Sequence, residues 1–156
     1  TAIPFLRDSF GSYRGYIWKK TIPLIKENFW IGNGPDTLAA YFPHYDVISM
    51  LNAFGRTNMI VDKPHNYYLQ VAHDTGVLSL IMLLTLFGYY FIQSIILQFR
   101  VSIDSELKSI SLAILAGVIG YLVAAIFVDS TVHVAPLFWV LLGTGFAANR
   151  LLIENK

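Results

Sequence analysis

The stretch 77-VLSLIMLLTLFGYYFIQSIILQF-99 decides the fold of this chain. None of its residues carries a formal charge. A helix rises about 1.5 Å per residue, so a helix of this length crosses a hydrocarbon layer of roughly 30 Å. The sequence therefore predicts a transmembrane helix over residues 77–99.

Two further apolar runs follow. Residues 110–128 form a second long run without a formal charge, in which Gly117 and Gly120 permit close contact between helices. A shorter run begins at residue 134, and we expect it to span the membrane by extending to residue 150. Buried helices of a soluble protein are the alternative, but two uncharged runs of membrane-spanning length do not favour it. We therefore expect an all-α integral membrane fold, in which three C-terminal transmembrane helices follow a partly helical loop.

Basic residues orient these helices. Arg100 and Lys108 lie in the connection 100–109, whereas the connection 129–133 has no Lys or Arg. The positive-inside rule then places 100–109 in the cytoplasm, and a long translocated segment such as 1–76 escapes the rule despite its several basic residues. We therefore predict an extracytoplasmic loop over residues 1–76 and an extracytoplasmic turn over residues 129–133. The predicted transmembrane helices cover residues 77–99, 110–128 and 134–150. The predicted cytoplasmic segments are the loop 100–109 and the tail 151–156.

Composition supports a membrane protein and excludes several functions. Only 13% of the residues are charged, against about a quarter in soluble domains. The net charge of +1, without a long basic run, gives no indication of a nucleic-acid partner. The absence of cysteine excludes disulfides, thiolate nucleophiles and cysteine-ligated zinc. No nucleotide-binding glycine motif is present. Thr1 is not followed by a signal peptide, and we expect the chain to be the C-terminal part of a longer protein with earlier spans upstream.

The loop 1–76 has several helix signals. Ser12 is a plausible N-cap for a helix over 13–28, and Asp36 for a short helix ending near Ala40. Residues 43–61 show no clear pattern, and we expect them to be irregular.

His65 is the main candidate for chemistry. Pro64 suits the first turn of a helix, so we expect a helix from Pro64 towards Gly76. His65, Leu69, Ala72 and Gly76 would then share one face of it. A neutral imidazole there is suited to take a proton from an incoming hydroxyl. The alternative is a histidine that caps or anchors the helix at the membrane surface.

Other polar residues have two interpretations each. Arg14 and Trp18 are four positions apart and share a helix face, where the arginine can bind phosphate and the indole a sugar, or the two can simply pack together. Asp129 and His133 follow the second apolar run, and they either face His65 or act as ordinary caps.

A metal site is not favoured by the spacing. His65 and His73 are eight positions apart, whereas a helical metal pair needs a separation of three or four. A site built from these histidines with Asp74 and Asp129 is the alternative. We expect no metal and no cofactor, and we expect His73 to be a bystander.

Three stretches together carry a family resemblance: 14-RGYIW-18 followed by 30-WIGNGPDT-37, then 64-PHNYYLQVAHDTGVLSLI-81, and finally 127-FVDSTVH-133 with Pro-Leu-Phe-Trp after a short gap. In this order they resemble the C-terminal portion of the O-antigen ligase and O-antigen polymerase superfamily of bacterial membrane glycosyltransferases. The resemblance implies a glycosyltransferase C-type fold in the cytoplasmic (inner) membrane, with the catalytic loop outside.

The resemblance also implies an activity. Such an enzyme transfers or polymerises glycan from an undecaprenyl-pyrophosphate donor to a glycan, lipid or protein acceptor, in contact with membrane lipid. It implies His65 as the base and Arg14 as a ligand of the pyrophosphate. Cations can neutralise that leaving group without a metal, and a single displacement inverts the anomeric carbon. The full set of candidate substrate-binding residues is Arg14, Trp18, Arg56, Asn66, Asp129 and His133.

The competing function is a non-enzymatic polysaccharide transporter or flippase component. Transporters commonly carry ionisable residues at the middle of the membrane. The runs 77–99 and 110–128 contain no Asp, Glu, Lys, Arg or His. This favours chemistry at the membrane surface over transport.

Overall fold

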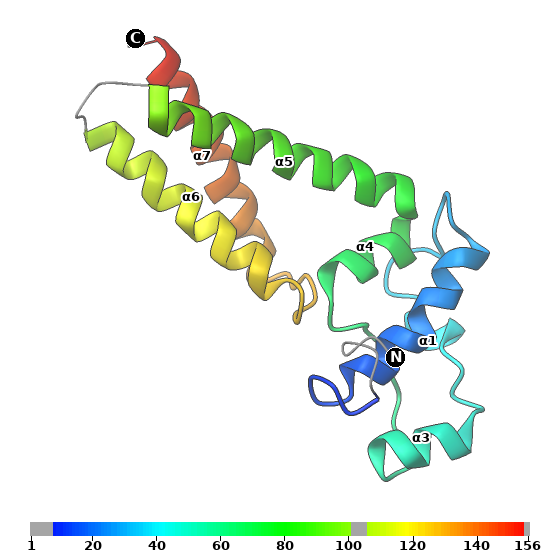
Figure 1. Ribbon diagram of the computed structural model, residues 1–156. Coiled ribbons are helices and arrows are strands. Elements are labelled where there is room, and N and C mark those ends of the chain that lie inside the picture. Colours follow the sequence, from blue (N-terminus) through cyan, green and yellow to red (C-terminus); the bar gives the residue numbers. More distant parts are fainter. Residues whose placement is uncertain (1–7, 101–105, 155–156) are drawn as a thin grey trace. The chain divides into compact units, whose positions relative to one another are not determined.

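The computed structural model describes residues 8–100 and 106–154. Within these ranges the chain forms helices and no strands (Figure 1), which confirms the all-α class. The helices are α1 (Arg14–Glu27), α2 (Leu38–Tyr41), α3 (Val47–Phe54), α4 (Tyr67–Thr75), α5 (Val77–Arg100), α6 (Glu106–Ala124) and α7 (Ala135–Glu154). Residues 106–109 of the predicted connection belong to α6, and residues 151–154 of the predicted tail belong to α7. Residues 101–105 and 155–156 of these two segments lie outside the described residues.

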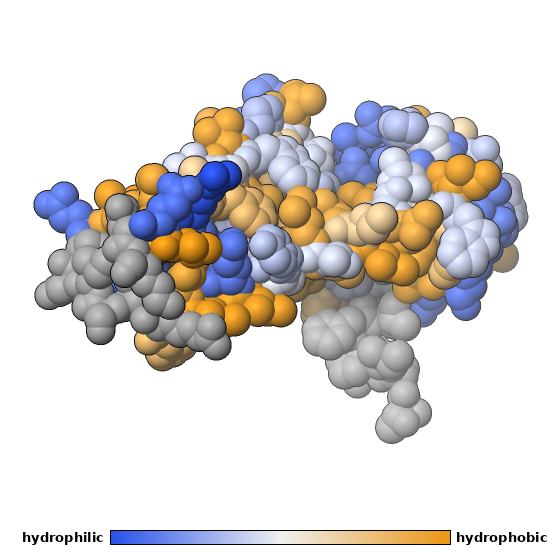
Figure 2. Space-filling model, turned by 90° about the horizontal axis from the view of Figure 1, so that it is seen from above, coloured by the Kyte–Doolittle hydropathy of each residue, from blue (hydrophilic) through white to orange (hydrophobic). Residues whose placement is uncertain are grey.

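Three helices are long and apolar enough to cross a membrane, namely Val77–Phe99 within α5, Glu106–Ala124 and Ala135–Glu154. This agrees with the three apolar runs in the sequence. Figure 2 shows hydrophobic residues exposed over much of the face that it presents. Such exposure is costly in water and is expected where side chains contact lipid.

The chain divides into two units, and each is described by itself. The first comprises Thr1–Ile81 and Ala125–Asp129, and the second comprises Met82–Ala124 and Ser130–Lys156. The short segment 125–129 therefore packs with the N-terminal residues, although it follows α6 directly in the sequence.

The first unit has a small hydrophobic core beneath α1. Tyr16, Ile17 and Trp18 of α1 are buried there. The loops and short helices supply the remaining buried residues, which are Leu38, Phe42, Met50, Ala53 and Val61. Burying one large apolar side chain stabilises a fold by about 1.5–3 kcal/mol, so this core stabilises the packing of the loops against α1.

Two predicted helix caps are wrong. Helix α1 begins after Tyr13, which makes no side-chain capping bond, and Ser12 lies in the left-handed region with φ 59°. Helix α2 begins after Thr37, and Asp36 before it has φ 56°. N-capping side chains normally act from an extended backbone, and the left-handed turns at Ser12 and Asp36 remove that geometry.

The expectation that residues 43–61 are irregular is also wrong, because they contain α3. Asp46 caps this helix by accepting a hydrogen bond from the Ser49 N–H at 3.2 Å. Gly55 ends it with φ 68°, a left-handed conformation that favours glycine. Asp46 also forms an ion pair with Lys20 of α1 at 2.8 Å, which ties α3 to the core helix.

In the second unit, a buried polar network joins the three long helices. Asn149 of α7 donates to Ser94 Oγ at 2.7 Å and to Gln93 Oε1 at 3.3 Å, both on α5. Its Oδ1 accepts from Ser111 of α6 at 3.2 Å. Hydrogen bonds between apolar helices help to select their partners, so Asn149 contributes to the specific packing of this unit.

Candidate active site

The backbone at His65 turns sharply just before α4. Asn66 is the N-cap of this helix, and its Oδ1 accepts from the Leu69 N–H at 2.9 Å. His65 therefore precedes the helix, with φ 50° in the left-handed region. A non-glycine residue in this region is strained by about 1–3 kcal/mol, and it keeps this conformation only where its neighbours hold it there.

This corrects the prediction that the helix begins at Pro64. Asparagine is among the best N-cap residues, whereas a start at Pro64 requires Lys63 as the cap. The predicted stripe of His65, Leu69, Ala72 and Gly76 consequently does not exist. His65 is presented by a turn at the N-terminal end of α4.

Asp129 holds both the side chain and the backbone at this turn. Its Oδ2 lies 2.7 Å from His65 Nδ1, and its Oδ1 accepts from the Asn66 N–H at 3.2 Å. An ionised carboxylate only accepts hydrogen bonds, so the proton of a neutral His65 is on Nδ1 and its Nε2 is free to accept. The His65 side chain is 46% exposed whereas that of Asp129 is 8% exposed. A buried carboxylate thus orients a histidine whose side chain is half-exposed.

Two further hydrogen bonds fix the turn on either side of His65. Trp18 Nε1 donates to the Pro64 carbonyl at 2.9 Å, and the Tyr67 N–H donates to the Ala125 carbonyl at 2.9 Å. The first anchors the turn to α1, and the second anchors it to the segment 125–129. Together with Asp129, these contacts stabilise the strained conformation of His65.

Arg14 is joined to the same segment. Its Nε donates to the Phe127 carbonyl at 3.1 Å, and its Nη1 donates to the Gly11 carbonyl at 2.7 Å. Phe127 is two positions before Asp129, so the guanidinium and the imidazole are both attached to residues 127–129. Among the residues that the structure describes, no ion pair involves Arg14.

The other predicted site residues occupy different environments. Trp18 is buried, and the Asn66 side chain is engaged in capping α4. Arg56 is exposed in the segment after α3, and no hydrogen bond among the described residues joins it to His65 or Arg14. His133 is exposed and belongs to the second unit. In the first unit, Asp129 thus contacts His65 and Asn66 directly, whereas Arg14 and Trp18 are bonded to the backbone of the neighbouring residues Phe127 and Pro64.

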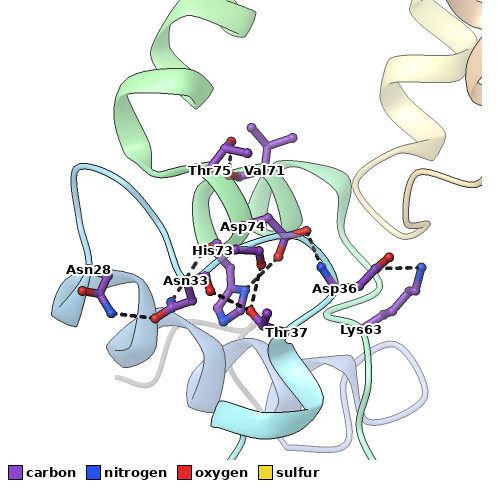
Figure 3. Close-up of polar contacts among 10 residues, drawn as sticks. Asn28, Asn33, Asp36, Thr37, Lys63, Val71, His73, Asp74 and Thr75 are labelled. Carbon is purple, nitrogen blue, oxygen red and sulfur yellow. Dashed lines mark hydrogen bonds and ion pairs between the residues drawn. The ribbon is translucent and has the colours of Figure 1, made fainter.

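A second histidine–carboxylate pair lies at the other end of α4. His73 is 1% exposed, and its Nδ1 lies 2.9 Å from Asp74 Oδ1. Figure 3 shows this pair beside Asn33 and Asp36 of the loop after α1. The two histidines pair with different carboxylates, and in the described ranges no three His, Asp or Glu residues form a group that could hold a metal ion.

Sequence reasoning missed the backbone acceptors of this site. The carbonyls of Ala125 and Phe127 bind the Tyr67 N–H and the Arg14 side chain, yet a carbonyl has no signature in the sequence. The capping role of Asn66 had a signal, because asparagine immediately precedes the first helical residue.

Comparison with known proteins adds the family to this geometry. The sequence matches the O-antigen ligase family over residues 2–84, which is more than half of the chain. No match to a curated protein or to a solved structure was found. The matched range contains Arg14, Trp18, Arg56, His65 and Asn66. The chain belongs to the O-antigen ligase family, and it is therefore a glycan-processing membrane protein.

Proposed function

We propose that this protein is a bacterial glycosyltransferase that transfers or polymerises glycan from an undecaprenyl-pyrophosphate donor at the outer face of the cytoplasmic membrane. It acts as a ligase or as a polymerase on a glycan, lipid or protein hydroxyl. The observation that carries the proposal is the 2.7 Å contact between the Asp129 carboxylate, which is buried, and Nδ1 of His65, whose side chain is half-exposed. Membership of the O-antigen ligase family supports the substrate class.

In the proposed step, His65 is the general base. The acceptor oxygen attacks the anomeric carbon of the donor, and its proton passes to His65 Nε2. The bond from that carbon to the pyrophosphate oxygen breaks, and undecaprenyl pyrophosphate leaves with the electron pair. The Asp129 carboxylate stabilises the imidazolium that forms. A single displacement from the opposite face inverts the anomeric configuration.

Arg14 is proposed to bind the pyrophosphate. A pyrophosphate leaving group needs its developing charge neutralised rather than protonated, and a guanidinium can do this without a metal or a cofactor. The bonds from Nε and Nη1 to backbone carbonyls fix the orientation of the guanidinium. Trp18, Asn66 and Asp129 act by positioning His65. Substrate contacts by Arg56 and His133 stay predictions from the sequence.

The test is a reconstituted reaction that separates bond formation from transport. The full-length protein is inserted into liposomes with a defined undecaprenyl-pyrophosphate glycan and an acceptor. We expect a new glycosidic bond with inverted anomeric configuration, detected by mass spectrometry and NMR. Movement of the donor across the bilayer without a new bond would instead identify a transporter or flippase component, and a retained configuration would exclude the single displacement.

A further inference from the structure

The loop 28–34 between α1 and α2 closes over the junction of α4 and α5. Its Asn33 N–H donates to the His73 carbonyl at 2.7 Å, and its Gly34 N–H donates to the Asp74 carbonyl at 3.0 Å. Its Phe29 carbonyl accepts from the Val77 N–H at 2.8 Å. Figures 1 and 3 show this loop rising beside the first turn of α5. The loop is therefore attached to the residue at which the apolar helix begins.

Two glycines permit an unusually close approach at this junction. A Cβ added to Gly32, where φ is 76°, would lie 2.6 Å from the Asp74 carbonyl. A Cβ on Gly76, where φ is 87°, would collide with the Trp30 carbonyl. The two backbones are thus in direct contact. Because they cannot separate without losing the three hydrogen bonds, the tip of the loop is held in place.

The tip of this held loop is strongly apolar and exposed. Trp30 is 67% exposed and Ile31 is 82% exposed. Phe29 packs edge-on against Trp30, with ring centroids 4.9 Å apart, so the indole is supported by a second aromatic ring. A fixed turn that presents a tryptophan and an isoleucine outwards needs an apolar or interfacial partner.

The neighbouring helix identifies that partner. The span of α5 begins at Val77, and its first turns expose Leu78 and Ile81. The membrane surface consequently meets α5 near Val77, which is the residue that binds the loop. Tryptophan is enriched at membrane–water interfaces because its ring is apolar and its N–H is polar.

We propose that the loop 28–34 is a membrane anchor that inserts Trp30 and Ile31 into the interface of the lipid leaflet at the N-terminal end of α5. The proposal goes beyond glycan transfer and does not depend on it. It has a consequence for the site, because α4 connects the anchored junction directly to the turn at His65. Helix α4 has 9 residues and rises about 1.5 Å per residue, so it sets the distance between the anchored junction and His65. The anchor therefore fixes the height of His65 relative to the lipid surface.

Spin labels on the full-length protein in lipid nanodiscs test the anchor. Single cysteines replace Ile31 and, in a second variant, Trp30, with Leu78→Cys as the lipid reference and Asn58→Cys as the exposed aqueous control. Collision rates with oxygen, which partitions into lipid, and with a water-soluble nickel chelate report the depth of each label. We expect the labels at positions 31 and 30 to show an oxygen-to-nickel ratio several times that of the label at position 58.

Two results would overturn the proposal. Labels at positions 30 and 31 with the aqueous ratio of position 58 would place the tip in water. Labels shielded from both reagents would show that protein, rather than lipid, covers the tip. Circular dichroism and size-exclusion profiles confirm that each labelled variant is folded, and glycan transfer is not needed for either readout.

Discussion

The two carboxylate oxygens of Asp129 contact two residues that are neighbours in the sequence. One oxygen is 2.7 Å from the His65 ring, and the other accepts from the Asn66 backbone at the start of α4. The histidine is therefore oriented by the same group that fixes the backbone beside it. If His65 is the base, Asp129 determines which of its nitrogens can accept the proton.

Replacing Asp129 with asparagine tests this positioning role. The amide of Asn can donate to Nδ1 and so favours the tautomer with the proton on Nε2, which cannot act as a base. We expect the turnover number for glycan transfer to fall by about 10²–10⁴-fold, with little change in KM for the donor. Steady-state kinetics of the reconstituted protein measure both constants.

Asp36→Asn is the matched control for this variant, since Asp36 is an exposed carboxylate that pairs with Lys63 at 3.3 Å. It should leave both kinetic constants near their wild-type values. A wild-type turnover number for Asp129→Asn would show that the contact with His65 is structural only.

The sequence indicated which residues belong to the candidate site better than it indicated which of them are in contact. His65 and Arg14 stood out by residue type and by the resemblance, and facing His65 was one of two interpretations of Asp129, which lies 64 positions further along the chain. Only the folding of segment 125–129 onto the first unit brings them into contact. The strained backbone of His65 was also invisible, because tertiary hydrogen bonds impose it against its intrinsic preference.

At the scale of elements, Asp46 links α3 to α1. The Lys20 ammonium, hydrogen-bonded to Asp46, together with the Ser49 hydrogen bonds, lowers the pKa of Asp46 from 3.8 to about 2. A carboxyl whose pKa is lower in the folded state stabilises the fold above the unfolded pKa. This stabilisation is lost as the pH falls from about 4 towards about 2.

We therefore predict a pH-dependent effect of Asp46→Asn. Asparagine is still a good N-cap, so the variant removes mainly the charge. Its unfolding temperature should lie below that of the wild type by a constant amount from pH 7 to pH 5, and the difference should narrow below about pH 4. Thermal unfolding followed by tryptophan fluorescence measures this difference.

Asp8→Asn, which removes an exposed carboxylate paired with Lys19 at 2.6 Å, controls for the loss of a surface charge. Exposed ion pairs contribute about 0–1 kcal/mol, so a small effect is expected. A difference for Asp46→Asn that stays unchanged down to pH 2.5 would contradict the assigned role of the ion pair.

The long helices were predictable because uncharged runs of membrane-spanning length have few other structural solutions. The short helices were not predictable, because the residue at which each begins or ends depends on which of several neighbouring residues acts as the cap. Asp46 and Gly55 bracket α3 and were available as signals, whereas Ser12 had the right side chain on the wrong backbone conformation. Residue type predicts a cap only where the backbone conformation lets the side chain reach the N–H groups of the first turn, and the left-handed turn at Ser12 does not provide it.

At the scale of the whole molecule, the basic residues of the connection 100–109 predict which side of the membrane each segment faces. We predict that residues 129–133 are outside the cytoplasm and that residue 109 is inside. Val132→Cys places a thiol at an exposed position between α6 and α7, and Ser109→Cys places one at an exposed position in the first turn of α6. A membrane-impermeant maleimide should label position 132 in intact spheroplasts and position 109 only after permeabilisation.

The reverse labelling pattern would place the turn at His65 on the cytoplasmic side, because segment 125–129 contacts that turn within one unit. An undecaprenyl-linked donor at the outer face would then be inaccessible to His65. The topology is thus a requirement of the proposed function, and this labelling experiment tests it without an enzymatic assay.

The central claim is that the His65 imidazole is the base in glycan transfer, and His65→Gly tests it most directly. Glycine suits the left-handed conformation at this position, so the variant removes the imidazole while relieving backbone strain. The measurement is the single-turnover rate of glycan transfer at saturating donor, with and without added imidazole. We predict a loss of about 10²–10⁴-fold that imidazole partly restores. Transfer at the wild-type rate without imidazole would contradict the claim.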